Sequence, residues 1–335
     1  MPNASTSPVF VSSAAATKVF RWRDAIGALQ TAYGDAIPAA AAPPRTVAAL
    51  ENVWLRTLPA IAPGCRHFGA KLMGVALSAD QPAVEYVIVL FDRQTSRIAA
   101  FVDGAQVTAY RTAATSAAAV DRMAHSGPAR LAVLGSGLEA AMHARAIAAV
   151  RPLAEISVFS PTTARREQFA VTMAGELGVP ARAMGTPVEA TQEADIIVAA
   201  ARSYGEQPIL FADWLKPRAL VVSIGSTVPQ QRELDVSVLA RASLIVCDRP
   251  DEVISDTGDM IAAARAGMDI APKCRSLGAL MAGRIPIPSE PSAVLVYKSV
   301  GSGLQDIVVA DLILAGARQA GLVAPLAAEF SRKPI

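Results

Sequence analysis

The segment Gly135-Ser136-Gly137-Leu138-Glu139-Ala140 has the residue types and spacing that bind the pyrophosphate of a dinucleotide. It follows the short apolar run LAVLG at 131–135 and leads into LEAAMHARAIAAV, a stretch with helical periodicity. In G-x-G-x-x-A, the first glycine allows the tight turn, the second lets the pyrophosphate approach the backbone, and the alanine lets the helix lie close to the sheet. The helix N-terminus adds free N–H groups and a positive dipole. Glycines at such a junction are often only turn residues, but the flanking elements favour nucleotide binding.

The turn after the next expected strand, EISVFS at 155–160, indicates which dinucleotide is bound. NAD-specific sites place an acid there, about 20 residues beyond the motif, to bind the ribose 2′-OH. Residues 160–166 read SPTTARR and contain no acid. Hydroxyl and guanidinium groups that suit a 2′-phosphate instead come from Ser160, Thr162, Thr163, Arg165 and Arg166. The alternative is that both arginines are solvated on the first turn of a helix. The missing acid favours NADPH, with NADH possible.

Three basic residues could bind a carboxylate. Arg45 follows Pro43-Pro44, Lys71 lies within the apolar run GAKLMGVAL, and Arg111 begins RTAATSA on an alanine-rich helix. Each by itself is most simply a surface cation or a capping residue. Lys71 fits that interpretation least, because burying an unpaired ammonium is costly. Two arginines and a lysine converging near a nicotinamide would form a carboxylate clamp, in which Lys71 could also transfer a proton.

A fourth candidate is the turn IGSTVPQQRELD at 224–235, which follows the apolar run LVVS at 220–223. A buried strand that ends in Gly-Ser-Thr delivers small polar side chains to the edge of a sheet, where α/β proteins bind their ligands. Ser226 and Thr227 are therefore candidate site residues.

Two kinds of hydrophobic pattern predict the elements that position these residues. Between about 130 and 250, short β-rich runs alternate with helical stretches, which is typical of βαβ units and a parallel sheet. Before residue 120, the runs at 69–77, 85–92 and 97–104 are separated by turn signals and predict an antiparallel meander. A helix at 109–124 should connect the two parts. After 290, a strand or turn leads into a long helix that we expect to return to the first part.

The sequence thus predicts an α/β fold in three segments. Residues 1–120 form the first part of an α+β domain, 121–295 a Rossmann-type domain that binds NAD(P), and 296–335 a C-terminal helix that returns to the first domain. The first 35 or so residues have no functional interpretation.

Composition excludes several classes of protein. Thirty-one basic and 29 acidic residues give a net charge of +2, which argues against a nucleic-acid-binding surface. No run approaches the roughly 18 apolar residues of a membrane span, and the N-terminus lacks the pattern of a signal peptide. The three cysteines are widely spaced, which suits a reducing cytoplasm. The three histidines share no ligand spacing, so no metal site is expected.

The chain resembles the ornithine cyclodeaminase/mu-crystallin family, which includes ornithine cyclodeaminases, some alanine dehydrogenases and imine reductases. The matching segments are RTVAAL, GAKLMGV, LFDRQTSRIAAFVDG, YRTAATSA, VLGSGLEA, ADIIVAA, WLKPRALVVSIGS, RELD and KSVGSGLQDIVVADLI. They span about residues 40–320. The resemblance implies a Rossmann domain, a discontinuous substrate domain and a homodimer built through that substrate domain.

The resemblance also implies roles for individual residues. Arg45, Lys71 and Arg111 match positions that hold the substrate carboxylate, and Ser226 and Thr227 match the place where nicotinamide and substrate meet. Lys71 and Thr227 are the predicted catalytic residues. The predicted cofactor-binding residues are Thr112, Gly135, Ser136, Gly137, Leu138, Ala140, Ser160, Thr162, Arg165, Arg166, Ala200 and Ser226.

Two positions depart from the family pattern. Ornithine cyclodeaminases have an aspartate where this chain has Thr227, and a neutral hydroxyl cannot balance a second substrate ammonium or act as a base near neutral pH. Gln305-Asp306 stands where the family often has Glu-Asp.

These features predict an NADPH-dependent reductase of a cyclic or linear imino acid, such as Δ1-pyrroline-2-carboxylate or Δ1-piperideine-2-carboxylate, that forms an L-amino acid. Four alternatives stay open. They are a cyclodeaminase that releases ammonia, an alanine dehydrogenase-like enzyme, a synthase that condenses two amino acids, and a non-catalytic NADPH-dependent ligand binder.

Overall fold

The computed structural model describes residues 7–77, 83–201, 207–290, 292–327 and 330–331. The chain divides into two compact units, and the first consists of two separate segments. Unit 1 comprises residues 1–111 and 302–335, and unit 2 comprises residues 112–301. These boundaries differ from the expected ones at 120 and 295, because α3 (Gly104–Met123) contributes most of its length to unit 2 and residues 296–301 belong to unit 2 as well.

Unit 1 is built on a mixed sheet in the order β15-β1-β6-β5-β4-β3-β2. The strands are β1 (Val9–Val11), β2 (Thr46–Leu50), β3 (Val53–Ala60), β4 (His67–Ala76), β5 (Ala83–Asp92), β6 (Ile98–Asp103) and β15 (Ala324–Pro325). The expected meander is confirmed, since β2 to β6 pair in antiparallel fashion in chain order. The sheet is mixed because β1 pairs parallel to β6. The turn DRQTS between β5 and β6 forms around Asp92, whose side chain accepts bonds from the backbone N–H groups of Gln94 and Thr95.

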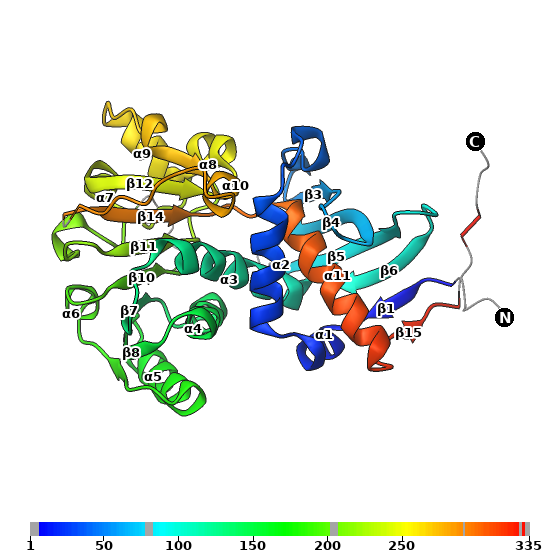
Figure 1. Ribbon diagram of the computed structural model, residues 1–335, viewed down its shortest axis with the longest axis horizontal. Coiled ribbons are helices and arrows are strands. Elements are labelled where there is room, and N and C mark those ends of the chain that lie inside the picture. The colour runs from blue at the N-terminus through cyan, green and yellow to red at the C-terminus, as the bar shows by residue number, and fades with distance from the viewer. Residues whose placement is uncertain (1–6, 78–82, 202–206, 291, 328–329, 332–335) are drawn as a thin grey trace. The chain divides into compact units, whose positions relative to one another are not determined.

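One face of this sheet is covered by helices from both segments of unit 1. The helices are α1 (Ser13–Val19), α2 (Trp22–Gly34) and α11 (Gly303–Gln319), with a short 3-10 turn η1 (Ala39–Ala41). As expected, the C-terminal helix returns to this unit, where α11 packs against strands β3 to β6 and against α2 (Figure 1). Its first eight residues are all buried. The register aligns Leu58 on β3, Lys71 on β4 and Ile88 on β5, so these three side chains point from the same, buried face.

Unit 2 contains the expected parallel sheet, in the order β13-β12-β14-β11-β10-β7-β8-β9, with every pairing parallel. Its strands are β7 (Ala129–Leu134), β8 (Leu153–Phe159), β9 (Ala181–Ala183), β10 (Ile196–Ala199), β11 (Leu220–Ser223), β12 (Ala242–Cys247), β13 (Cys274–Ser276) and β14 (Val294–Lys298). All residues of β10, β11 and β14 are buried, as is typical of a sheet covered on both faces. The chain places β8 on one side of β7 and β10 on the other, which makes β7/β10 the switch point where such sheets bind ligands.

The helices of unit 2 follow the strands in the α/β pattern. Besides the larger part of α3, they are α4 (Leu138–Val150), α5 (Thr163–Leu177), α6 (Pro187–Thr191), α7 (Val236–Arg241), α8 (Pro250–Asp256), α9 (Gly258–Arg265) and α10 (Leu277–Met281), with 3-10 turns η2 (Ala212–Trp214) and η3 (Ala271–Lys273). α4 and α5 pack on the β7 to β9 part of the sheet, and α8 and α10 pack on β12 (Figure 1). The position of β14 between β11 and β12 was not predicted.

Within the described residues, no helix is both long and apolar enough to cross a membrane. The same part of the chain holds no group of three or more His, Cys, Asp or Glu residues arranged to bind a metal ion.

Candidate active site

Lys71 lies in the interior of unit 1, as its apolar neighbours in the sequence suggest. Its side chain comes from the middle of β4 and points to the face that α11 covers. The ammonium group lies 2.9 Å from Oδ1 of Asp306 and 5.8 Å from the centre of the Tyr86 ring. Burial lowers the pKa of Lys71 to about 8, while Asp306 raises it and Arg111 lowers it further. A lysine with this pKa exists in both protonation states near neutral pH, which suits a group that exchanges protons.

Asp306 joins Lys71 to Arg111. Its Oδ1 lies 2.9 Å from Lys71 Nζ and 3.0 Å from Arg111 Nε. All three side chains are buried. Among the described residues, Asp306 Oδ2 has no hydrogen-bond partner. Two cations thus share one carboxylate in a site of low polarity, and the cluster of Lys71, Arg111 and Asp306 carries a net positive charge when the lysine is protonated.

A second set of hydrogen bonds orients Arg111. Its Nη1 donates to Oε1 of Gln305 at 2.8 Å, and Nε2 of Gln305 donates to the hydroxyl of Tyr33 at 2.9 Å. The Tyr33 hydroxyl is in turn 3.3 Å from the Ser302 hydroxyl. Tyr33 is on α2, so the N-terminal region that had no functional interpretation contributes a side chain to the surroundings of Arg111.

Sequence reasoning missed three residues in and around this cluster and left one prediction open. Asp306 was not identified as the acid that Lys71 and Arg111 share, and Tyr33 was not identified as a partner of Gln305. Arg56 was not identified as a nearby charge that also lowers the pKa of Lys71. An acid at 306 beside the apolar run IVVADLIL was the available signal for the first. Arg45 is half-buried and directly precedes β2, and extending the strand register aligns it with Leu58 and Lys71. Its role as a third carboxylate ligand stays a prediction.

In unit 2, the turn between β7 and α4 has the form that G-x-G-x-x-A predicts. Gly135 has a φ of +123°, and a Cβ there would lie 2.6 Å from the carbonyl oxygen of Ala200, so only glycine fits. Nothing lies within 4 Å of the position a Cβ would take on Gly137, which leaves room for a phosphate beside the backbone. Ala140, the third residue of α4, is fully buried. These residues fit a dinucleotide whose pyrophosphate lies at the N-terminus of α4.

Apart from Thr112, the other predicted cofactor residues of unit 2 follow the carboxyl ends of β7, β8 and β10. Leu138 is exposed at the start of α4, Ala200 follows β10, and Thr112 is on α3, where its carbonyl accepts a bond from Ser116. The Ser136 hydroxyl donates to the Ser160 hydroxyl at 2.9 Å, which connects the ends of β7 and β8.

The turn after β8 retains the groups expected for a 2′-phosphate, although one arginine has an additional function. Arg165 is exposed, and Thr162 is the exposed residue that precedes α5. Arg166 donates to the carbonyl oxygen of Ser160 at 2.9 Å, and its guanidinium lies 5.6 Å from the centre of the Phe159 ring. Arg166 therefore also stabilises the turn, which the sequence alone did not indicate.

The turn after β11 folds onto itself through Gln231. The Ser226 hydroxyl donates to the Gln231 carbonyl. The backbone N–H and the hydroxyl of Thr227 both point to Oε1 of Gln231, at 3.2 and 3.4 Å. Ser226 and Thr227 thus lie at the carboxyl end of β11, the edge that was predicted, but their catalytic and cofactor-binding roles stay predictions.

Comparison with known proteins identifies the family. The model of the ornithine cyclodeaminase/mu-crystallin family matches residues 9–320. The chain belongs to this family. It is 31% identical to the ketimine reductase mu-crystallin of Mus musculus over 232 residues, which cover 69% of each chain. It is 28% identical to a Delta(1)-pyrroline-2-carboxylate reductase of Bacillus cereus over 269 residues, or 79% of this chain and 82% of the relative.

Solved structures of the ornithine cyclodeaminase/mu-crystallin family share the fold. The Delta(1)-pyrroline-2-carboxylate reductase of Thermococcus litoralis, in complex with NADH and L-proline, matches with a TM-score of 0.87 at 22% identity. The match covers 95% of this chain and 100% of that chain. The distant relatives of this chain therefore include imine reductases, and the α/β fold with a Rossmann-like sheet is that of the family.

Proposed function

We propose that this chain is an NADPH-dependent reductase of a cyclic or linear imino acid, of the Δ1-pyrroline-2-carboxylate or Δ1-piperideine-2-carboxylate type, and that it forms an L-amino acid. The observation that carries the proposal is the buried cluster in which Lys71 and Arg111 share Asp306. The cluster combines a net positive charge with a lysine whose pKa is lowered by burial to about 8. Relatives that reduce imines support the reaction class.

Each member of the cluster has a distinct role in this proposal. Arg111 binds the substrate carboxylate, since its guanidinium is held in place by Gln305 and Asp306 and matches a carboxylate with two parallel donors. Arg45 is the predicted third cation for that carboxylate. Lys71 keeps the imine nitrogen protonated, because a protonated imine is the better electrophile. Asp306 Oδ2 is suited to accept a hydrogen bond from an iminium N–H. When bound, the reduced nicotinamide supplies the hydride.

Preference for NADPH is supported by the turn after β8. It offers the exposed side chains of Thr162 and Arg165, beside the buried Ser160 hydroxyl that Ser136 contacts. Residues 160–166 contain no carboxylate that would repel a 2′-phosphate. The other N–H groups of Arg166, which do not bind the Ser160 carbonyl, also favour a 2′-phosphate, since guanidinium binds phosphate through several donors.

Thr227 distinguishes the reductase from a cyclodeaminase. A diamino acid substrate carries a second ammonium, which needs a carboxylate when it is enclosed. Thr227 offers only a neutral hydroxyl, oriented by Gln231. In the proposed reductase this hydroxyl binds a water or the substrate ring and has no charge to balance.

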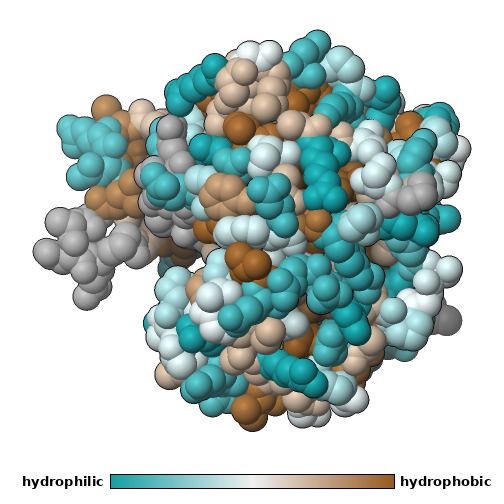
Figure 2. Space-filling view, turned by 90° about the vertical axis from the view of Figure 1, so that its left-hand side faces the viewer, coloured by the Kyte–Doolittle hydropathy of each residue, from teal (hydrophilic) through white to brown (hydrophobic). Residues whose placement is uncertain are grey.

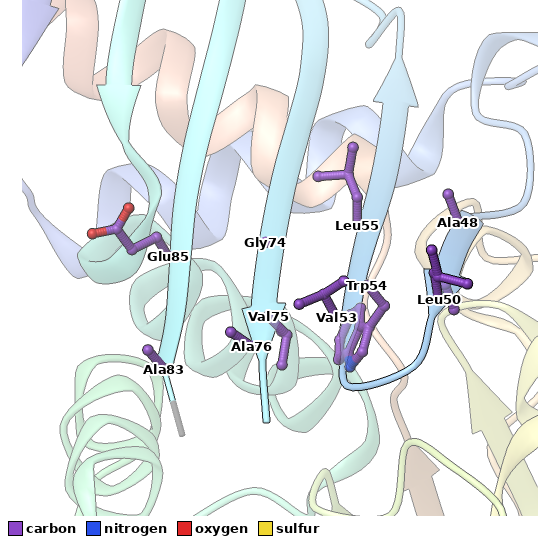
Figure 3. Close-up of a pocket in the computed structure, with 11 residues that line it drawn as sticks. Ala48, Leu50, Val53, Trp54, Leu55, Gly74, Val75, Ala76, Ala83 and Glu85 are labelled. Atoms are coloured by element: carbon purple, nitrogen blue, oxygen red, sulfur yellow. The ribbon is translucent and has the colours of Figure 1, made fainter. Parts of the chain in front are cut away.

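A homodimer formed through unit 1 is the proposed assembly. The sheet face opposite Lys71 has an apolar pocket lined by residues of β2 to β5, including Leu50, Val53 and Leu55 (Figure 3). These three side chains are between 44% and 72% exposed, which is more apolar surface than a strand normally leaves in water. By contrast, the side shown in Figure 2, the left of Figure 1, is largely hydrophilic with separate small apolar spots. Leu55→Asp should convert the dimer to a monomer, measured by light scattering.

The reaction is tested by incubating the protein with NADPH or NADH and a panel of substrates while the absorbance of the reduced cofactor is followed. The panel contains cyclic imino acids, pyruvate with ammonia, and ornithine. Consumption of NADPH with a pyrroline or piperideine carboxylate is the expected result. Consumption only with pyruvate and ammonia would indicate an alanine dehydrogenase-like enzyme, and release of ammonia from ornithine without net cofactor turnover would contradict the proposal.

Two sets of variants test the residue roles. Lys71→Ala should abolish turnover and leave cofactor binding intact, whereas Lys18→Ala, at an exposed lysine of the same unit, should change neither. Retained activity would remove Lys71 from the mechanism. Replacing Arg165 and Arg166 by alanine should weaken binding of NADPH much more than binding of NADH, and an equal loss for both cofactors would contradict the 2′-phosphate assignment.

A further inference from the structure

A buried carboxyl group holds the turn that follows β11 in unit 2. Glu233 is fully buried, and its Oε2 accepts hydrogen bonds from the Ser223 hydroxyl at 2.7 Å and from the Gly225 N–H at 2.8 Å. Its Oε1 lies so close to Gly225 that a Cβ there would be 2.3 Å away, which explains the glycine. Glu233 therefore fixes the start of the turn that carries Ser226 and Thr227.

Two further buried charges complete this arrangement. Lys298, the last residue of β14, lies 2.9 Å from Oδ2 of Asp259 and donates to the Ser223 hydroxyl at 2.9 Å and the Ser226 carbonyl at 3.2 Å. Asp259 Oδ1 accepts from the backbone N–H groups of Glu233 and Leu234 at 2.8 and 3.0 Å. The backbone of Glu233 is thus anchored by Asp259, and its side chain and Lys298 both hold the turn after β11.

The protonation state of Glu233 decides the net charge of this buried group. The charged groups that face it are Lys298 from β14 and Asp259 from α9, which balance each other, and the remaining contacts are the Ser223 hydroxyl and the Gly225 N–H. Burial raises the pKa of Glu233 to about 7, with Lys298 opposing the rise and Asp259 adding to it. Among the described residues, Oε1 has no hydrogen-bond partner, so the ionised form is incompletely compensated. A nearby positive charge would therefore shift the balance toward the carboxylate.

The position of the turn in the sheet identifies such a charge. A dinucleotide bound at the β7/β10 switch point, with its adenosine half at the end of β8, extends its nicotinamide half toward the ends of β10 and β11. The oxidised nicotinamide ring carries a positive charge and the reduced ring is neutral. Glu233 and Lys298 contact the turn at the end of β11, and Asp259 contacts the backbone of Glu233.

We propose that Glu233 is a positioning residue that couples the turn Gly225–Thr227 to the charge of the nicotinamide, so that binding of the oxidised cofactor releases a proton from Glu233 and binding of the reduced cofactor does not. The inference rests on the nicotinamide part of the proposed function, and it is independent of the imino acid substrate. In this arrangement the ionised carboxylate favours the oxidised ring, while the protonated form is retained with the reduced ring. Glu233 thereby adjusts the relative affinity for the two cofactor states with pH.

Calorimetric titration with NAD⁺ and NADH tests the coupling without any turnover. These cofactors lack the 2′-phosphate, whose own titration near neutral pH would obscure the signal. Between about pH 6 and about pH 8.5, affinity for NAD⁺ should rise by up to about tenfold, the limit for a shift of one pKa unit, and affinity for NADH should change little. Repeating the titration in buffers with different enthalpies of protonation should show net proton release with NAD⁺ only.

Glu233→Gln keeps the shape of the side chain and removes its titration. In this variant the pH dependence of NAD⁺ affinity should disappear and its affinity at alkaline pH should fall, whereas Glu176→Gln, on the exposed end of α5, should behave as wild type. A melting curve shows whether the variant is folded; if it is not, the proton count for the wild-type protein decides. Equal proton release with NAD⁺ and NADH, or an unchanged pH dependence in folded Glu233→Gln, would overturn the inference. Because no imino acid is present, absence of reductase activity would contradict the proposed function alone.

Discussion

Replacing Lys71 by methionine should change how the stability of the protein depends on pH. Methionine keeps most of the volume of the side chain and removes its charge. The pKa of Lys71 in the folded protein is about 8, against 10.5 for the ordinary value, and burial is the main cause. Between these two pH values the unfolded chain binds more protons than the folded one, so the free energy of unfolding of the wild type rises with pH. The variant lacks this contribution.

The size of the effect follows from the shift. A difference of 2.5 pKa units, from 10.5 to about 8, corresponds to about 3 kcal/mol at 1.36 kcal/mol per unit. The destabilisation by Lys71 is fully present below pH 8, where the buried lysine is protonated, and is absent above about pH 10.5. The difference in free energy of unfolding, wild type minus Lys71→Met, should therefore increase by about 3 kcal/mol across this window.

Urea unfolding followed by circular dichroism at several pH values between about 7 and 10.5 measures this difference. Other titrating groups occur in both proteins and cancel in the comparison. Lys18→Met, at an exposed lysine on α1, is the matched control and should leave the pH profile as in the wild type. A difference between wild type and Lys71→Met that stays constant over the whole range would refute the assignment of Lys71 as a buried lysine with a lowered pKa.

Three further substitutions test the charged cluster of unit 1 and the glycine turn of unit 2. Asp306→Asn leaves Lys71 and Arg111 without their shared carboxylate, so it should lower the free energy of unfolding by about 3–5 kcal/mol and lower the pKa of Lys71 further. Urea unfolding measures the first effect and the pH–rate profile the second. An unchanged pH–rate profile would contradict the pairing of Asp306 with Lys71. Gln305→Glu adds a carboxylate beside Arg111, so it should raise the KM for an imino acid and extend activity to higher pH. A lower KM would contradict the proposed binding of the substrate carboxylate by Arg111. Gly135→Ala places a Cβ 2.6 Å from the Ala200 carbonyl oxygen at a φ of +123°, so it should weaken cofactor binding by at least about tenfold. Fluorescence titration measures the affinity. Wild-type affinity in the variant would show that this turn does not bind the cofactor.

Much of the fold could be predicted because its signals are local. The apolar runs of β7, β8, β10 and β11 are short, uninterrupted and separated by helical periodicity, and this pattern has few interpretations other than a parallel sheet. The strand order could not be predicted. β14 lies between β11 and β12, and its pairing partners are set by packing between segments far apart in the chain.

The residues of the candidate site likewise divide into those that the sequence indicates and those that only the structure shows. Lys71 was identifiable because a charge in an apolar strand is conspicuous, and Gly135 because its motif encodes a backbone conformation. Asp306 had only the weaker signal of an acid beside an apolar run, and Tyr33 and Glu233 had no signal of this kind. Each is a common polar residue whose importance comes from what it contacts, more than 200 residues away in the chain for the first two.

By itself, the sequence determined the types of element, the dinucleotide motif and the three cations of unit 1, because periodicity, glycine conformation and misplaced charge are properties of neighbouring residues. Only the tertiary structure decided which acid neutralises which cation. Long-range packing of α11 on β4 brings Asp306 to Lys71, and the pairing of β11 with β14 brings Lys298 to the turn that Glu233 holds. The pKa values of Lys71 and Glu233 depend on that burial, since desolvation is the largest cause of both shifts and exists only in the folded chain.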